Sequence, residues 1–97
     1  MTNNFSFLGQ LEKIIDERRS APVESSYTSS LLNGDAHRLA QKIGEEGVEL
    51  ALASVGNDRE RVVAEAADLL YHVMVLLAAK RLSLNDVAEE LERRHTR

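Results

Sequence analysis

The sequence predicts an all-α fold, a helical bundle of about four to five helices in one domain that spans residues 1–97. Apolar residues recur at helical spacing, and no segment alternates apolar and polar residues as a strand does. Proline occurs once and aromatic residues make up 4% of the chain, whereas the helix formers Ala, Leu, Glu and Arg are abundant. A chain of this length builds at most one domain.

The first helix is predicted over residues 5–19, where Phe, Leu and Ile recur at helical spacing. Pro22 ends it, because proline cannot continue a helix. Residues 25–30 are rich in hydroxyl groups and are interpreted as a loop. Two readings of this loop stay open: a turn with capping hydroxyls, or a hydroxyl loop beside a ligand. A short turn from Thr28 or Ser29 carries two leucines and stops at Asn33 and Gly34.

Three longer helices follow. Residues 35 to about 55 form one, and residues 57 to about 81 form the next, because Asn57 and Glu60 have the form of a capping box. Ser83 and Asp86 repeat this pattern and predict a last helix to about residue 95. The short connections between these helices predict antiparallel neighbours.

Composition excludes several classes of protein. The net charge is −4 and no basic block is present, which argues against nucleic acid as a partner. The chain has no cysteine, so disulfides and thiolate metal sites are ruled out. The longest strictly apolar run, residues 73–79, is too short to span a bilayer. The first residues do not resemble a signal peptide, so a cytoplasmic protein with no membrane partner is expected.

The helix predicted over residues 57–81 is the most informative element. Between residues 62 and 79 its polar side chains are Glu65, Asp68, Tyr71 and His72. A helix that is apolar on every side is normally buried, and four helices of this length can hardly cover it within one chain. We therefore expect a two-fold symmetric homodimer that completes the bundle. A carboxylate on such a helix must be paired, protonated or bound to a metal.

Two pairs of carboxylates share the same spacing. Glu65 and Asp68 lie one turn apart on one helix, and Glu46 and Glu49 lie one turn apart on the preceding one. By itself, the stretch that holds Glu45, Glu46 and Glu49 is typical of a solvated helix face. Two matched pairs on adjacent antiparallel helices instead predict a shared site for Mg²⁺, with Mn²⁺ as a substitute, since oxygen ligands suit these ions.

Three nearby side chains have more than one interpretation. Arg38 and Lys42 precede Glu46 by two turns and one turn. They either form salt bridges within the helix or hold phosphate oxygens beside a metal. His72 lies one turn after Asp68 and is a metal ligand, a partner that supports a ligand, or a packed helix residue.

The acidic pattern, Glu-Glu-x-x-Glu followed by Glu-x-x-Asp, resembles the all-α nucleoside triphosphate pyrophosphohydrolases, which include MazG and the dimeric dUTPases. Longer strings resemble one family within that superfamily, the phosphoribosyl-ATP pyrophosphohydrolases of histidine biosynthesis. These strings are Ser-Tyr-Thr at 26–28, Ala-Gln-Lys-Ile-Gly-Glu-Glu at 40–46, Glu-Ala-Ala-Asp-Leu-Leu-Tyr-His at 65–72, Leu-Ser-Leu at 82–84 and Glu-Arg-Arg-His at 92–95. The similarity covers residues 8–95. The chain departs from it at Gly47, where Ala is expected, and at Arg81, where Gly is expected.

The resemblance implies a dimeric, magnesium-dependent enzyme that hydrolyses phosphoribosyl-ATP to phosphoribosyl-AMP and pyrophosphate. It also implies roles for particular residues. Glu46, Glu49, Glu65 and Asp68 would hold the metal, and Glu45 would orient or deprotonate the attacking water or bind a second metal. The residues expected to contact the nucleotide are Arg38 and Lys42 at the phosphates, and Ser26, Tyr27 and Thr28 at the nucleotide or ribose-phosphate pocket.

Two alternatives remain on the sequence alone. A house-cleaning pyrophosphatase of the MazG type, acting on a non-standard nucleoside triphosphate, would share the metal site and differ in the pocket for the base and ribose. A non-enzymatic helical interaction module would use the same acidic residues only to pair with Arg and Lys of a partner. Magnesium-dependent release of pyrophosphate separates both enzymes from the module.

Overall fold

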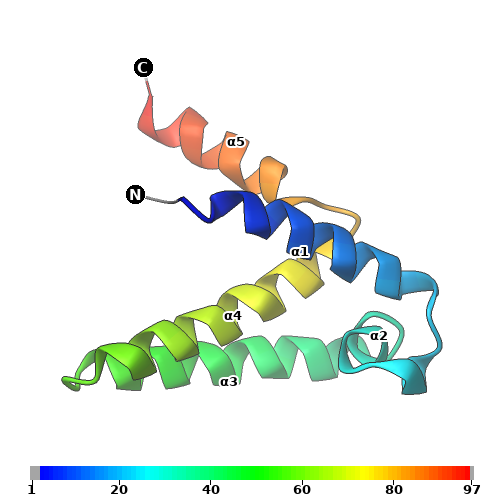
Figure 1. Cartoon of the computed structure of the whole chain (residues 1–97), viewed down its shortest axis with the longest axis horizontal. Helices are drawn as coiled ribbons and strands as arrows, with labels where there is room; N and C mark the ends of the chain where they lie inside the picture. The colour runs from blue at the N-terminus through cyan, green and yellow to red at the C-terminus, as the bar shows by residue number, and fades with distance from the viewer. Residues whose placement is uncertain (1–2, 97) are drawn as a thin grey trace.

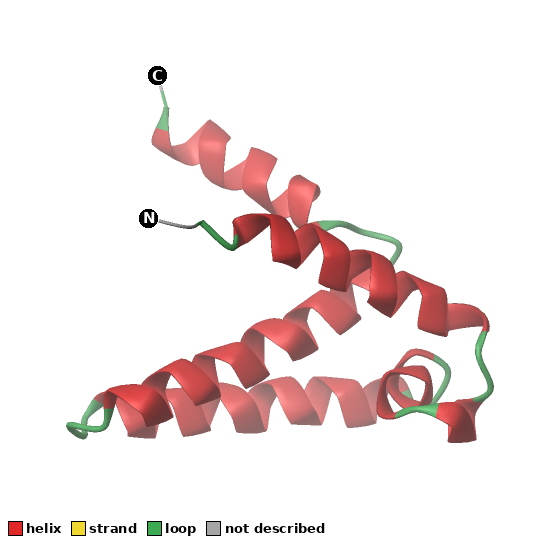
Figure 2. Cartoon of the chain, in the orientation of Figure 1, coloured by secondary structure: helices red, strands yellow, loops and turns green. Residues whose placement is uncertain are grey.

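The structure is a computed structural model that describes residues 3–96, and all regular structure in that range is helical. The all-α prediction is therefore confirmed. Figure 2 shows that the loops are short compared with the helices. In chain order the elements are α1 (Phe5–Glu17), the 3-10 turns η1 (Arg18–Ser20) and η2 (Val23–Ser25), α2 (Tyr27–Leu32), α3 (Ala36–Ser54), α4 (Arg59–Ala79) and α5 (Leu84–His95) (Figure 1).

Side-chain caps set where the last three helices begin. The Asp35 carboxylate accepts the backbone N–H of His37 at the start of α3, and this bond lowers the pKa of Asp35. The predicted capping box of Ser83 and Asp86 at α5 is confirmed. The predicted box at Asn57 is wrong, because Asp58 caps α4 by accepting the N–H of Arg61. Aspartate and asparagine are equally good caps, so the sequence alone did not distinguish these neighbours.

The hydroxyl-rich segment is partly helical, which corrects the prediction of a loop over residues 25–30. The helix α2 begins at Tyr27, one or two residues before the turn predicted from Thr28 or Ser29. The Ser26 side chain accepts the N–H of Ser29 at 3.0 Å and so caps this helix. The Ser29 hydroxyl is fully buried and donates to the carbonyl of Arg18 at 2.8 Å, which anchors α2 to the end of the first helical segment.

The helices α3 and α4 form an antiparallel hairpin that positions the candidate site (Figure 1). Helix α1 crosses the C-terminal half of α4, and α2 packs against η1, η2 and the same half of α4. The core therefore lies at one end of the hairpin. Its buried members come from all four of these helices and are Ile15, Leu31, Leu39, Met74, Val75 and Ala78.

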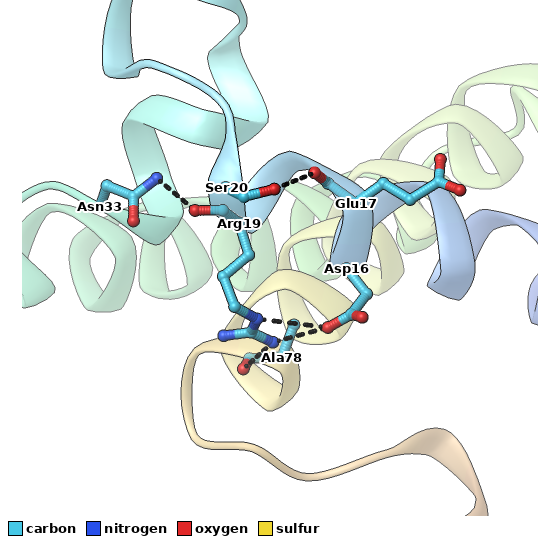
Figure 3. A network of polar contacts seen from close by, with 6 residues as sticks. All are labelled: Asp16, Glu17, Arg19, Ser20, Asn33 and Ala78. Atoms are coloured by element: carbon cyan, nitrogen blue, oxygen red, sulfur yellow. Dashed lines mark hydrogen bonds and ion pairs between the residues drawn. The ribbon is translucent and has the colours of Figure 1, made fainter.

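A polar network fixes the crossing of α1 and α4 (Figure 3). The Arg19 guanidinium donates to the Asp16 carboxylate at 2.9 Å and to the backbone carbonyl of Ala78 at 2.8 Å. The Asn33 side chain donates to the carbonyl of Arg19 at 3.3 Å. One arginine thus satisfies a carbonyl at the C-terminal end of α4, where a positive charge is favourable, and links α1 and α2 to that end.

Helix α5 diverges from α4, which differs from the prediction that it packs as an antiparallel neighbour (Figure 1). The chain leaves α4 through a Schellman turn, in which Leu82 N–H donates to the carbonyl of Leu77 at 2.8 Å. Arg81 occupies the left-handed position of this turn with φ 61°. The start of α5 is attached to α1 through the Glu12 carboxylate, which accepts the N–H of Leu84 at 2.7 Å.

The far end of the hairpin is poorly covered. Several apolar side chains in this part of the hairpin are exposed: Val48 and Leu52 on α3, Val55 just after it, and Val63 on α4. The prediction that α4 is buried along its length therefore holds within one chain only for its C-terminal half. Among the described helices, α4 alone has the length and hydropathy to cross a membrane, and 28% of its most apolar window is buried. One such helix is weak evidence of a membrane span, because the core helix of a soluble protein has the same length and hydropathy.

Candidate functional site

Three of the four carboxylates predicted to bind metal come together. One oxygen each from Glu46, Glu65 and Asp68 lies within 4.8 Å of the other two. Glu65 and Asp68 stand one turn apart on α4, and Glu46 faces them from the antiparallel α3. The Glu46 side chain is 14% exposed and Glu65 is half-buried, whereas Asp68 is exposed. We refer to these three residues as the acidic cluster.

The acidic cluster fits a small divalent cation. Oxygen atoms bound to one Mg²⁺ at about 2.1 Å lie at most about 4.2 Å apart, so small side-chain rotations would bring these three into range. Three negative charges this close repel one another unless a cation or protons lie between them. Carboxylate oxygens without sulfur or imidazole ligands favour magnesium or manganese over softer metals.

Glu49, the fourth predicted ligand, lies outside the acidic cluster. Its carboxylate forms an ion pair with the Arg61 guanidinium at 3.8 Å, and both side chains are about half exposed. Arg61 precedes Glu65 by one turn on α4, a spacing that places it at the edge of the site and that the sequence interpretation overlooked. An ion pair this exposed contributes at most about 1 kcal/mol, so a bound cation can replace Arg61 as the partner of Glu49.

Lys42 lies between two glutamates of its own helix. Its ammonium nitrogen is 3.7 Å from Glu45 and 3.6 Å from Glu46. Glu45 also accepts a hydrogen bond from Gln41 at 3.0 Å, and its side chain is 51% exposed. Of the two readings of Lys42, the salt bridges within the helix are present, and the contact with a phosphate stays a prediction.

Arg38 contacts the hydroxyl segment and not a carboxylate. Its guanidinium donates to the Ser30 hydroxyl at 3.4 Å and lies over the Tyr27 ring, 5.6 Å from the ring centroid. This is the geometry of a cation–π contact. Arg38 therefore extends the site from the acidic cluster toward α2.

His72 is buried, and both of its ring nitrogens have partners. Nδ1 lies 2.8 Å from the backbone carbonyl of Asp68, which can only accept, so Nδ1 carries the proton. In the neutral ring Nε2 is then an acceptor, and the Tyr27 hydroxyl donates to it at 2.9 Å. Of the three readings of His72, this geometry favours a residue that supports others, because neither nitrogen is free for a metal.

The three predicted pocket residues play different structural parts. Ser26 caps α2, Tyr27 bonds to His72, and the Thr28 hydroxyl is hydrogen-bonded to the Tyr71 hydroxyl. Tyr71 was not among the predicted site residues. The available signal was its position: it is polar, lies on an apolar helix and follows Asp68 by one turn.

Comparisons with a family model and with individual proteins indicate the same family. A model of the family described as phosphoribosyl-ATP pyrophosphohydrolase matches residues 8–95. The chain is 50% identical over 92 residues to the histidine biosynthesis bifunctional protein HisIE of Campylobacter jejuni, covering 95% of this chain and 44% of that protein. It is 51% identical over 89 residues to the protein of the same name from Escherichia coli O6:H1, covering 92% of this chain and 44% of that protein. The chain thus spans less than half the length of these relatives.

Proposed function

Because the chain belongs to the phosphoribosyl-ATP pyrophosphohydrolase family, we propose that it hydrolyses phosphoribosyl-ATP to phosphoribosyl-AMP and pyrophosphate, a step of histidine biosynthesis. The observation that carries this proposal is the family match over residues 8–95, nearly the whole chain. The acidic cluster supports the proposal independently. Hydrolysis of a phosphoanhydride requires positive charge beside the phosphates, and these carboxylates can hold a cation that supplies it.

The proposal assigns Mg²⁺ to the acidic cluster, with Mn²⁺ as a substitute. Glu46, Glu65 and Asp68 would hold it, and Glu49 would complete the set after leaving Arg61. A magnesium ion bound there would supply positive charge that neutralises the phosphate oxygens. The charge balance of the site supports this, because the three clustered carboxylates have one close cationic side chain, Lys42.

We propose the remaining roles from the positions of the side chains. Glu45 is exposed beside the cluster and can orient or deprotonate an attacking water, once its hydrogen bond with Gln41 and its contact with Lys42 loosen. Lys42 and Arg38 would contact phosphate oxygens along α3. Ser26, Tyr27 and Thr28 would line the nucleotide pocket, where Tyr27 and Thr28 are fixed by α4.

We also propose that the enzyme acts in the cytoplasm as a homodimer and as one nucleotide pyrophosphohydrolase domain. The exposed apolar side chains at the far end of the α3–α4 hairpin support the dimer.

One assay tests the proposed function. Purified protein is given phosphoribosyl-ATP, ATP or each dNTP with and without magnesium, and released pyrophosphate is measured. We expect magnesium-dependent release from phosphoribosyl-ATP that exceeds the other rates by orders of magnitude. Comparable rates across the panel would indicate a house-cleaning pyrophosphatase of the MazG type, and no release from any substrate would indicate a non-enzymatic interaction module.

A further inference from the structure

One aromatic ring beside the acidic cluster is held firmly and yet remains accessible. The Tyr27 hydroxyl donates to His72 at 2.9 Å, and the two rings meet edge to face at 5.8 Å between centroids. The Arg38 guanidinium lies over the same tyrosine ring, 5.6 Å from its centroid, and the Tyr71 ring is nearly parallel to it at 6.4 Å between centroids. Tyr27 is nevertheless 43% exposed. An aromatic ring that is held in place and already has a flat guanidinium over it is suited to bind a flat ligand group in the same position.

The Tyr27 ring and the acidic cluster lie at different positions along α4, so the two ends of the site differ. His72 follows Asp68 by four residues, about 6 Å along the axis of α4. Tyr27 therefore lies beyond the cluster on the side of α2, while Arg61 and Glu49 mark the opposite side, toward the tip of the hairpin. The site thus has an aromatic end and a metal-binding centre.

We propose that the purine base of the substrate stacks on Tyr27 in the place of the Arg38 guanidinium, which then turns to the phosphates, and that His72 is a positioning residue that holds the tyrosine ring for this contact. The nucleoside end of the substrate then points toward α2, and the scissile phosphates lie over the acidic cluster. Aromatic side chains bind bases through their faces, and phosphates need the positive charge that a metal brings to the carboxylates. The inference rests on the proposed function, of which it specifies the binding orientation.

The chemistry of His72 explains why it suits this role. Its Nδ1–H is fixed by the carbonyl of Asp68, which leaves Nε2 as an acceptor aimed at Tyr27. The hydrogen bond between Thr28 and Tyr71 holds the first turn of α2 on α4 at the neighbouring residue. Together these contacts restrict both the ring and the backbone that carries it. Binding of a ligand to the ring therefore costs little additional conformational entropy.

The first experiment uses the two tyrosines of the chain, both at this site, as reporters. Protein labelled with 3-fluorotyrosine gives one fluorine NMR signal for each, and Tyr27→Phe assigns them. With magnesium present, AMP should shift the Tyr27 signal strongly, whereas inorganic pyrophosphate should leave it nearly unchanged. A Tyr27 signal that ignores AMP, or that shifts equally with pyrophosphate, would overturn the orientation.

The second experiment separates positioning from folding. In His72→Asn the amide replaces the Nδ1 contact with Asp68 and the contact with Tyr27 is lost, whereas in His72→Gln the longer amide reaches Tyr27. We expect His72→Asn and Tyr27→Phe each to raise KM about three- to tenfold, the range of one hydrogen bond, with a smaller effect on kcat. His72→Gln should recover most of this loss. The double variant Tyr27→Phe/His72→Asn should be no worse than either single variant, because both remove the same contact.

A matched control is His37→Asn, which alters a histidine whose side chain is 96% exposed and contacts Asp35. It should leave KM unchanged. Equal KM values for His72→Asn, His72→Gln and wild type would refute the positioning role, as would a fall in kcat alone. If wild type releases no pyrophosphate from phosphoribosyl-ATP, the proposed function fails, whereas the fluorine NMR experiment still decides whether Tyr27 contacts a purine nucleotide.

Discussion

Glu65 is the residue whose charge most directly defines the candidate site. It is half-buried on α4, and its oxygen lies within 4.8 Å of those of Glu46 and Asp68. The close cation, Lys42, is 3.6 Å from Glu46 and is shared with Glu45. The protein without metal therefore keeps net repulsion at this point, as functional sites commonly do at the expense of stability.

Replacement of Glu65 by Gln should consequently stabilise the metal-free protein. We expect a gain of about 1 kcal/mol from relieved repulsion. Magnesium should raise the melting temperature of the wild type by mass action and that of Glu65→Gln much less. Pyrophosphate release should fall at least about a hundredfold. Thermal melting with and without magnesium, together with the pyrophosphate assay, measures all three effects.

The control for that experiment is Glu89→Gln, which removes the same charge from an exposed position on α5. Its magnesium response and activity should match those of wild type. If Glu65→Gln instead lowers the stability of the metal-free protein and responds to magnesium normally, Glu65 is a structural ion-pair partner and the metal assignment is wrong.

The backbone conformation of Arg81 also lowers the stability of the protein. It adopts φ 61° after α4, a conformation that disfavours any residue with a Cβ, and Gly is the residue that the family resemblance leads us to expect there. Arg81→Gly should raise the free energy of unfolding by about 0.5–1 kcal/mol, part of the gain being offset by the greater freedom of glycine in the unfolded chain. Urea denaturation at one protein concentration measures this, and Arg81→Ala, which loses the same side chain but keeps the strain, should show no gain.

At the level of helices, the start of α4 offers a sharp comparison between two adjacent residues. Asp58, and not Asn57, accepts a backbone N–H from the first turn of the helix. We expect Asp58→Ala to lower the free energy of unfolding by about 1 kcal/mol. Asn57→Ala should change it by less than about 0.5 kcal/mol, as for other exposed residues. Equal effects in denaturant titrations would mean that both residues share the cap.

Most helix positions follow from the sequence because periodicity and capping residues are local signals. The ranges predicted for the first, third and last long helices agree with the structure to within two residues of α1, α4 and α5. The start of α2 was missed, since serine and threonine favour caps, turns and loops alike. The divergence of α5 was also missed, because it depends on the left-handed geometry at Arg81 and on the contact of Glu12 with Leu84.

The part of the candidate site that depends on local helical spacing was also predictable from the sequence. The spacing of three residues on each of two antiparallel helices is enough to bring Glu46, Glu65 and Asp68 together. The separate ion pair of Glu49 depends on the position of Arg61 across the hairpin, which a helical wheel of α3 does not contain. The link between Tyr27 and His72 joins segments 45 residues apart, so no local pattern indicates it.

For the whole molecule, the exposed apolar side chains of the hairpin predict self-association. Val55 is 84% exposed and Val63 is 66% exposed, while Val48 and Leu52 on α3 are each more than half exposed. A stable dimer buries about 1,200–2,000 Å² in total, and these exposed apolar side chains are positions that such an interface would cover. We expect light scattering at micromolar concentration to report twice the mass of one chain.

Substitution tests where the interface lies. Val63→Asp places a charge at one of these exposed apolar positions and should shift the protein toward monomer. Val23→Asp places the same charge on another exposed valine, in η2, and should leave the mass unchanged. A wild-type protein that is monomeric at micromolar concentration would exclude the dimer, and a dimer unaffected by Val63→Asp would place its interface on another surface.

The short connection between α3 and α4 also bears on the order in which the chain assembles. The acidic cluster belongs to two helices that follow one another along the chain, so its geometry requires only the closure of a local hairpin, a fast step in folding. The hydrogen bonds made by α1 and η1 join residues much farther apart along the chain, 72 positions from Glu12 to Leu84 and 59 from Arg19 to Ala78. The carboxylates are therefore expected to meet before the terminal helices dock, and magnesium present during refolding would bind and stabilise an early intermediate as well as the native state.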